Sequence, residues 1–187
     1  ADNEKILAEA IQELKDKEFK ELYTHTKIKN RAFVKEVTID TDFELLFPDQ
    51  YIYNITERLN LYTKLAEIKN QADLISLQKT LQDRFGELPP QVVSLLDSVR
   101  IKWIAIKMGL ERVIIKQGRF IGYFISDQHS VFYQTKNFSK VLDFAKDNPN
   151  RVKIKEKNTR KGLRLLLTIE KVSSISKALS ILQKAAL

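Results

Sequence analysis

Residues 81–90 read Leu-Gln-Asp-Arg-Phe-Gly-Glu-Leu-Pro-Pro, and they separate two segments of helical periodicity. Gly86 is expected to end the first helix, because glycine takes a positive φ without steric cost. Pro90 suits the first turn of the next helix, where its missing N–H is not needed. The stretch therefore predicts consecutive helices over 71–85 and 91–108, joined by a short connector.

Upstream of this pair, the pattern indicates two short strands and a further helix. Residues 33–38 and 42–47 are rich in β-branched and aromatic side chains, so both are expected to be strands. Apolar residues then recur at helical spacing over 54–69, and Asn54 stands three residues before Glu57, which is the spacing of a capping box.

After Gly109 the apolar period changes to that of strands. The expected elements are strands at 113–115 and 120–125 around a turn at Gly118-Arg119, a third strand at 131–133, a helix over 138–146, strands at 152–157 and 163–170 around a turn at Lys161-Gly162, and a final helix to Leu187 with Ser173 or Ser174 as its cap. Helical and strand blocks are segregated, so the predicted fold class is α+β. A small β-sheet packs with a three-helix block and a C-terminal helix, preceded by a linker helix.

The start of the chain has a different organisation. Residues 3–17 form an amphipathic pattern, and a polar stretch without a clear period follows to Arg31. We interpret 1–32 as a linker helix and connector from a preceding module, and 33–187 as one α/β domain. Because the first residue is not Met and the sequence begins mid-pattern, we expect a piece of a longer protein.

Composition bounds the location and the chemistry. There are no cysteines, which excludes disulfides, thiol nucleophiles and cysteine-ligated metals. No signal-peptide pattern opens the sequence, and no apolar run approaches the roughly 20 residues of a membrane-spanning helix. A cytoplasmic location without membrane contact is expected.

A search for catalytic motifs is negative. Neither a phosphate-binding Gly-x4-Gly-Lys-Ser/Thr loop nor a Gly-x-Gly-x-x-Gly pattern occurs. His25 and His129 lie far apart, outside any metal-ligand spacing. Two acid pairs have the spacing to share a cation, but their flanks are typical of ordinary strand and helix surface: Asp40 with Asp42, and Asp143 with Asp147. We expect no catalytic residue, no metal site and no cofactor site in this chain.

Charge is distributed unevenly. Residues 1–99 hold 13 Lys and Arg against 18 Asp and Glu, a net −5, whereas residues 100–187 hold 19 against 6, a net +13. Seven basic residues in the second half are candidates for nucleic-acid contact: Arg151, Lys153, Lys155, Lys157, Arg160, Lys161 and Arg164. The competing interpretation is a solvated edge hairpin whose lysines block edge pairing. Aromatic residues for base stacking are not interleaved there.

Asp83 is unexplained by local structure. A carboxylate near a helix C-terminus opposes the helix dipole by about 0.3–1 kcal/mol where it is exposed. Arg84 is adjacent in sequence but points about 100° away on a helix. A cation from elsewhere is therefore the expected partner of Asp83.

Three spaced blocks of this sequence resemble a known family. They are Phe-Pro-Asp-Gln-Tyr-Ile at 47–52, Asn-Ile-Thr-Glu-Arg-Leu-Asn-Leu-Tyr at 54–62, and Leu-Gln-Asp-Arg-Phe-Gly-Glu-Leu-Pro-Pro at 81–90. In this order they resemble the C-terminal regulatory domain of bacterial transcription-repair coupling factors (Mfd). The resemblance runs from about residue 33 to the end, and residues 4–16 resemble the helix that joins the family's translocase motor to this domain.

The resemblance implies a function for the whole protein and a role for this domain. The whole protein would be an ATP-driven DNA translocase that binds double-stranded DNA, removes stalled RNA polymerase and recruits excision repair. ATP and Mg²⁺ would belong to the motor, whose motifs this chain lacks. The domain would pack on a UvrB-like N-terminal module of the same chain and hide its UvrA-binding surface.

The family places two acidic residues one helical turn apart before its Arg-Phe-Gly, where they pair with arginines of that module. Asp83 matches the second position, and Thr80 departs from the first. The resemblance therefore implies a contact through Asp83, with Asp73 or Glu87 as substitutes for the missing acid. A nucleic-acid-binding module using the basic half stays open as the alternative function.

Overall fold

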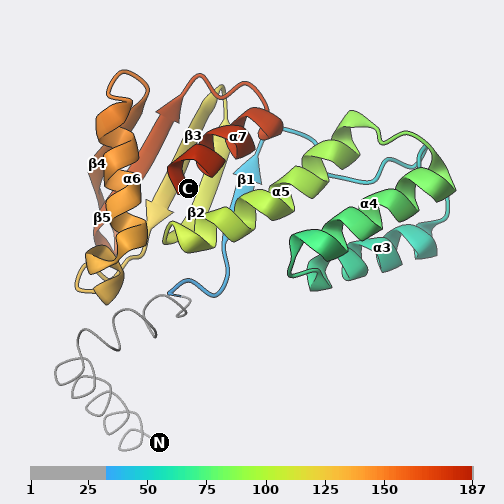
Figure 1. Cartoon of the computed structure of the whole chain (residues 1–187), viewed down its shortest axis with the longest axis horizontal. Coiled ribbons are helices and arrows are strands. Elements are labelled where there is room, and N and C mark those ends of the chain that lie inside the picture. The colour runs from blue at the N-terminus through green and yellow to red at the C-terminus, as the bar shows by residue number, and fades with distance from the viewer. Residues whose placement is uncertain (1–32, 187) are drawn as a thin grey trace, which may run out of the picture.

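The computed structural model describes residues 33–186 (Figure 1). The expected helix over 3–17, the connector that follows it and the domain boundary at residue 32 lie outside these residues. The helices are α3 (Ile55–Glu67), α4 (Gln71–Phe85), α5 (Pro90–Lys107), α6 (Lys136–Asp147) and α7 (Ile175–Ala186), with a 3₁₀ turn η2 (Val131–Gln134). The strands are β1 (Thr38–Thr41), β2 (Leu110–Lys116), β3 (Arg119–Phe124), β4 (Val152–Thr159) and β5 (Gly162–Glu170).

The strands form one mixed sheet in the order β1-β2-β3-β5-β4. β1 runs parallel to β2, and every other neighbouring pair is antiparallel. Two hairpins, β2–β3 and β4–β5, therefore meet through β3 and β5 in the middle of the sheet. This arrangement confirms the predicted α+β class.

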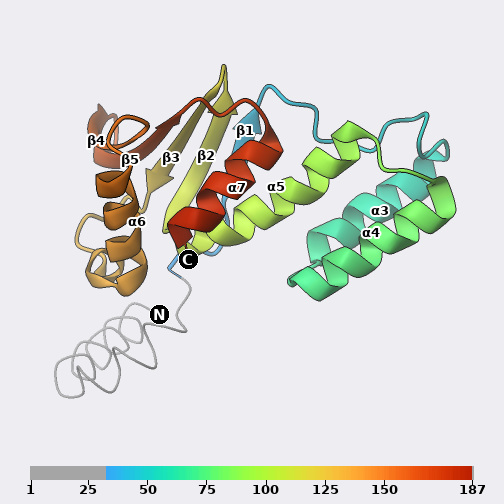
Figure 2. The ribbon, with the colours of Figure 1, turned by 45° about the horizontal axis from the view of Figure 1, so that its top comes forward.

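Three helices cover one face of the sheet, as Figures 1 and 2 show for α5, α6 and α7. The inward side chains of the strands form a continuous core with these helices, and they include Val113, Phe120, Leu167 and Val152 from four strands. Val113 and Leu167 both lie opposite Gly122, and Phe120 and Val152 both lie opposite Ile169, two residues along the same strands. The four side chains therefore share one face of the sheet.

A second core lies in the lobe formed by α3, α4 and the first half of α5. Each helix contributes a buried leucine to this core: Leu61 from α3, Leu74 from α4 and Leu96 from α5. Because α5 contributes Leu96 to this core and Ile101 to the sheet core, it belongs to both.

Polar side chains join the two cores where α5 passes between them. The buried Asp97 accepts a hydrogen bond from Ser176 Oγ of α7 at 2.8 Å and pairs with Arg100 Nη1 at 3.0 Å. Arg100 Nε in turn donates to Gln71 Oε1 of α4 at 2.9 Å. Burial of the carboxylate is compensated by these partners, which fix α5 against α4 and α7.

The local signals of the sequence act as expected at most helix ends. Asn54 Oδ1 accepts from Glu57 N at 3.0 Å, and Ser174 Oγ accepts from Lys177 N, also at 3.0 Å. Pro90 occupies the first turn of α5. Gly86 ends α4 with φ 87°, as predicted. Its ψ of −163° lies outside the left-handed helical region, in a region open almost only to glycine.

Several predicted strands were wrong. One strand, Thr38–Thr41, replaces the two expected at 33–38 and 42–47, because within 33–47 only these four residues pair with β2. Residues 131–133 form the turn η2 instead of a strand, since Ser130 Oγ accepts from Phe132 N and caps it. The two hairpin turns lie one residue earlier than expected, at 117–118 and 160–161.

Within the described range, no helix is both long and apolar enough to cross a membrane.

Candidate functional site

The C-terminal end of α4 presents acidic side chains to solvent. The Asp83 side chain is exposed, and its carboxylate makes no hydrogen bond or ion pair with any other residue from 33 to 186. Glu87, just after Gly86, is also exposed. Thr80 is half-buried, and its hydroxyl donates to Ser76 O at 3.0 Å. Asp83 and Glu87 therefore offer two carboxylates beside this helix end, and Thr80 offers no charge.

Neighbouring residues hold this helix end rigidly and occupy the nearest cation. Arg84 pairs with Glu57 of α3 and lies over the ring of Phe85, 4.8 Å from its centroid. Tyr51 donates from its hydroxyl to Leu81 O at 3.1 Å and to Gly86 O at 2.9 Å, so it satisfies carbonyls at the end of α4. Because Arg84 is engaged with Glu57, it does not compensate the charge of Asp83.

Asp73, a suggested substitute for the missing acid at position 80, lies at the opposite end of α4. It forms the N-terminal cap with Asn70, whose Nδ2 donates to Asp73 Oδ2 at 3.0 Å and whose Oδ1 accepts from Asp73 N at 2.9 Å. Ten residues of helix separate Asp73 from Asp83, which is about 15 Å. Of the two suggested substitutes, Glu87 lies nearer to Asp83 along the chain.

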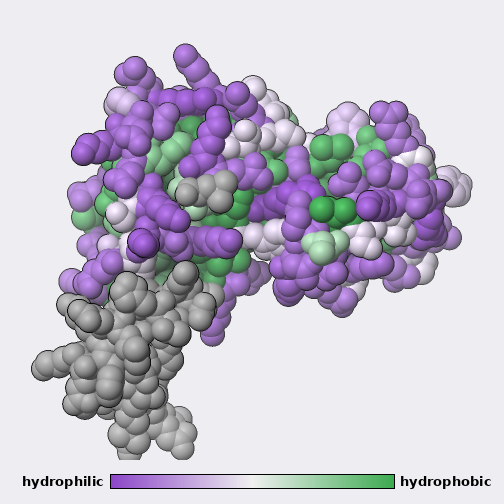
Figure 3. Space-filling view, in the orientation of Figure 1, coloured by the Kyte–Doolittle hydropathy of each residue, from purple (hydrophilic) through white to green (hydrophobic). Residues whose placement is uncertain are grey.

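Apolar side chains reach the surface of the same lobe, as the green areas over α4 and α5 in Figure 3 illustrate. Tyr53, just before α3, is 91% exposed, and Ile55 and Leu59 on α3 are 64% and 60% exposed. They flank Glu57, the partner of Arg84, so they lie at the end of the α3–α4 hairpin that carries Asp83. Exposed apolar side chains beside a charge are typical of a protein-binding surface. Their exposure was not predicted, because Ile55 and Leu59 belong to the apolar period over 54–69 in the sequence.

The seven basic candidates do not form one surface. Arg151 precedes β4, and its guanidinium donates to Glu170 O at 2.9 Å and to Lys171 O at 2.8 Å, so it supports the sheet. Arg164 pairs with Glu111 and donates to Phe124 O. Arg160 and Lys161 form the exposed β4–β5 turn.

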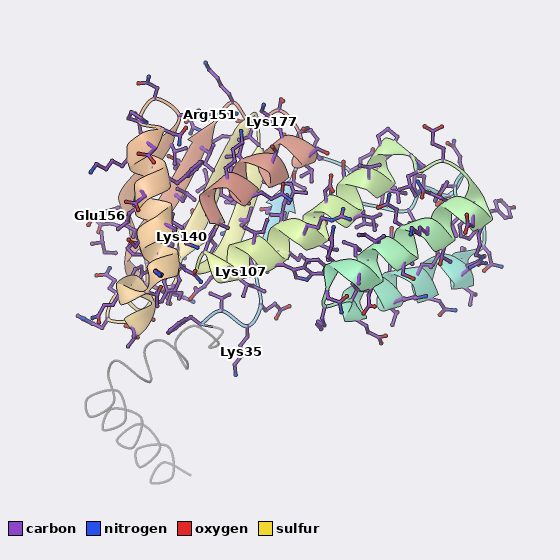
Figure 4. The ribbon with its side chains drawn as sticks, in the orientation of Figure 1. Lys35, Lys107, Lys140, Arg151, Glu156 and Lys177 are labelled. Carbon is purple, nitrogen blue, oxygen red and sulfur yellow. The ribbon has the colours of Figure 1, made fainter. Side chains whose placement is uncertain are left out.

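The remaining three, Lys153, Lys155 and Lys157, are exposed and project from β4 on the side away from the helices. Arg151 lies just before β4 and is not part of this row, because its guanidinium is bound to the backbone carbonyls of Glu170 and Lys171. Figure 4 shows Arg151 at one end of the β4 edge and Glu156 further along that edge. The cation row of β4 therefore consists of three lysines.

The sheet face also brings the candidate Arg164 together with Arg112 and Tyr123, which the sequence did not indicate as site residues. The guanidinium carbons of Arg112 and Arg164 lie 5.7 and 5.6 Å from the ring centroid of Tyr123. These residues come from β2, β5 and β3, and only the strand register makes them neighbours. No local pattern could have revealed the cluster.

The other chemical candidates have ordinary partners. Asp40 pairs with Lys116 at 3.1 Å and with Arg112 at 3.5 Å; the hydrogen bond from Lys116, more than any other contact, holds the pKa of Asp40 below its usual value. Asp42 accepts from Gln117 N at 3.1 Å. His129 is exposed, and His25 lies outside the described residues. Asp143 and Asp147 are exposed on α6. Across residues 33–186, no three His, Cys, Asp or Glu side chains converge as metal ligands.

Comparison with known proteins gives consistent similarities. The TRCF domain model matches residues 41–135. A transcription-repair-coupling factor from Rickettsia typhi is 25% identical over 152 residues, which is 81% of this chain and 13% of that protein. One from Staphylococcus aureus strain USA300 is 32% identical over 93 residues, half of this chain and 8% of that protein. The chain therefore spans only a small part of the length of these relatives.

A crystal structure of the C-terminal domain of transcription-repair coupling factor has a similar fold. It superposes with a TM-score of 0.61 at 21% identity, covering 81% of this chain and 89% of that domain. The matched blocks at 47–62 and 81–90 fall within the range of the family model. The family model matches half of the chain, and the fold agrees with that of a solved domain of this kind. The chain therefore belongs to the TRCF domain family.

Proposed function

We propose that this chain is a non-catalytic regulatory domain of a transcription-repair coupling factor, which acts by docking on the UvrB-like module of its own protein and masking the surface that binds UvrA. The complete protein would be an ATP-dependent DNA translocase that acts on RNA polymerase. Membership of the TRCF domain family supports this assignment, as does the match to an isolated C-terminal domain of such a factor.

The observation that carries the docking proposal is the uncompensated charge of Asp83. Its carboxylate is exposed at a helix end that disfavours negative charge, while the adjacent Arg84 is held by Glu57. An arginine on the docking partner would supply the missing cation through a charge-assisted, bidentate hydrogen bond. The exposed Tyr53, Ile55 and Leu59 would supply apolar contact area from the same lobe.

The experiment compares UvrA binding by the complete protein and by two charge-matched variants. Asp83→Asn removes the docking charge and should increase UvrA binding, because the masked surface becomes exposed more often. Glu67→Gln removes one carboxylate from the exposed C-terminal turn of α3, at the other end of the hairpin, and should leave UvrA binding unchanged. Equal UvrA binding by wild type and Asp83→Asn would reject the proposal.

A further inference from the structure

The sheet face opposite α5, α6 and α7 carries a cross-strand array that no described helix covers. Two rows follow from the strand register, running from β2 through β3 and β5 to β4. The rows are Ile114–Ile121–Thr168–Lys153 and Arg112–Tyr123–Leu166–Lys155. Apolar side chains lie in the middle of this face, and cations lie toward β2 and β4.

Most charges on this face outside β4 are neutralised within the sheet. Asp40 pairs with Arg112 and Lys116, and Arg119 Nε pairs with Glu170 at 2.9 Å. Arg164 pairs with Glu111, as described above. All three carboxylates of this region are thus engaged, and none of them pairs with a lysine of β4.

The lysines of β4 form a row of one sign. Lys153, Lys155 and Lys157 alternate with inward residues, so their side chains follow one another at intervals of about 6.6 Å. None makes an ion pair with another residue in the described part of the chain. Glu156, the acidic residue between them, projects to the opposite face because strand side chains alternate.

The row continues into the exposed β4–β5 turn, where Arg160 and Lys161 add two more cations. β4 is an edge strand, so no other strand among residues 33–186 lies beyond the row. Regular spacing and a single sign suit a regular polyanion, such as a phosphate backbone, better than an irregular acidic protein surface.

Aromatic contacts decide which kind of nucleic acid fits. Tyr123 is flanked by two guanidiniums and is partly buried, and no residue of the β4 row or its turn is aromatic. Single strands bind through bases stacked on exposed aromatic rings, which this surface lacks. Backbone contact to a duplex needs only aligned cations.

We propose that Lys153, Lys155, Lys157, Arg160 and Lys161 form a sequence-independent contact surface for the phosphate backbone of duplex DNA. This surface lies on the sheet, on a different lobe from Asp83, so the proposal goes beyond the docking function and does not depend on it. It would let the domain contact DNA while the three-helix lobe is docked or free.

The test measures binding of a labelled 20-base-pair DNA duplex to the 187-residue chain by fluorescence anisotropy, across a series of salt concentrations. A triple variant, Lys153→Gln with Lys155→Gln and Lys157→Gln, should weaken binding by about tenfold at low salt. It should also reduce the slope of log affinity against log salt by about 2.7, or about 0.9 for each lost phosphate contact.

Two control variants separate this surface from net charge and from edge protection. Gln at Lys64, Lys69 and Lys79, all exposed on the three-helix lobe, removes the same charge and should leave duplex affinity within about twofold of wild type, because those lysines lie off the contact surface. A second control, Lys153→Arg with Lys155→Arg and Lys157→Arg, keeps both charge and fold, and should retain duplex binding.

Three results would overturn the proposal. The first is no duplex binding by the wild type at low salt, and the second is equal weakening in the β4 variant and the three-helix-lobe control. The third is competition by a single strand, or by polyglutamate of matched charge, as strong as competition by unlabelled duplex. That outcome would assign the surface to single strands or to acidic proteins instead.

Discussion

At the residue scale, two glycines with nearly the same positive φ have different surroundings. Gly109 has φ 75° and Gly118 has φ 74°. A methyl group on Gly109 would lie 2.3 Å from the ring of Phe132, whereas one on Gly118 would have no neighbour within 4 Å. The close approach of η2 to the start of β2 therefore depends on glycine at position 109.

Alanine at these two positions separates backbone strain from overpacking. Gly118→Ala should lower the free energy of unfolding by about 1 kcal/mol, the cost of a left-handed conformation for a residue with a Cβ. Gly109→Ala should cost about 1–3 kcal/mol more, because the ring of Phe132 must move. Urea denaturation of both variants checks this. Equal losses would show that Phe132 yields without strain.

Tyr133 makes a pH-dependent contribution to the free energy of unfolding. Burial, more than any other effect, raises the pKa of Tyr133 to about 12, while Arg164 opposes the rise and Glu111 and Asp127 reinforce it. Because the pKa is higher in the folded state, the stabilisation is fully present below about pH 10 and is lost as pH rises toward 12. The free energy of unfolding should therefore fall over this window, and Tyr133→Phe should fall less steeply when the two are compared by denaturant titration at pH 8, 10 and 11. Parallel pH profiles would argue against a buried Tyr133.

At the scale of elements, α5 couples the two cores. Leu96 is 1% exposed in the three-helix lobe and Ile101 is fully buried in the sheet core, five residues further along the same helix. The hydrogen-bonded group of Asp97, Ser176, Arg100 and Gln71 lies at the crossing between them. Loss of order in one lobe therefore removes packing from the other.

Truncation of either residue should lower the stability of both lobes together. Leu96→Ala and Ile101→Ala should each cost about 2–5 kcal/mol, the range for large-to-small changes in a core. Far-ultraviolet circular dichroism and the fluorescence of Trp103, the single tryptophan of the chain, should still give one coincident transition in each variant. Two separated transitions would show that the lobes unfold independently.

Elements with a local signal were predictable, and those selected by distant pairing were not. The helical period and the caps at Asn54 and Ser174 defined their helices from neighbouring residues alone. In contrast, β-forming side chains fill much of 33–47, and only parallel pairing with β2, about 74 residues away, selects Thr38–Thr41. Likewise, the hydroxyl of Tyr133 donates to Ile125 O and helps to hold η2 as a turn.

The candidate site divides in the same way. Helix geometry alone indicated that Asp83 and Arg84 point apart. The engagement of Arg84 with Glu57, 27 residues away in sequence, needed the structure because it depends on how α3 and α4 pack. The limit of the cation row to three lysines also depended on tertiary contacts, since the backbone carbonyls of Glu170 and Lys171, at the end of β5, bind Arg151.

At the scale of the whole molecule, the two lobes present different surfaces. The three-helix lobe carries Asp83, Glu87 and exposed apolar side chains, which suit a protein partner that bears arginine. The sheet carries the lysine row of β4 on the face away from its helices. The uneven charge of the sequence thus corresponds to a division of surfaces between lobes joined by α5.

The most direct measurement of the central claim is the affinity of this chain for the UvrB-like module, determined by isothermal titration calorimetry. Asp83→Asn should weaken binding by about tenfold, the loss of one charge-assisted hydrogen bond. Thr80→Glu should strengthen it by adding a carboxylate one helical turn away, and Glu67→Gln should leave it unchanged. If Asp83→Asn binds as tightly as wild type, Asp83 is not the docking residue and the account is contradicted.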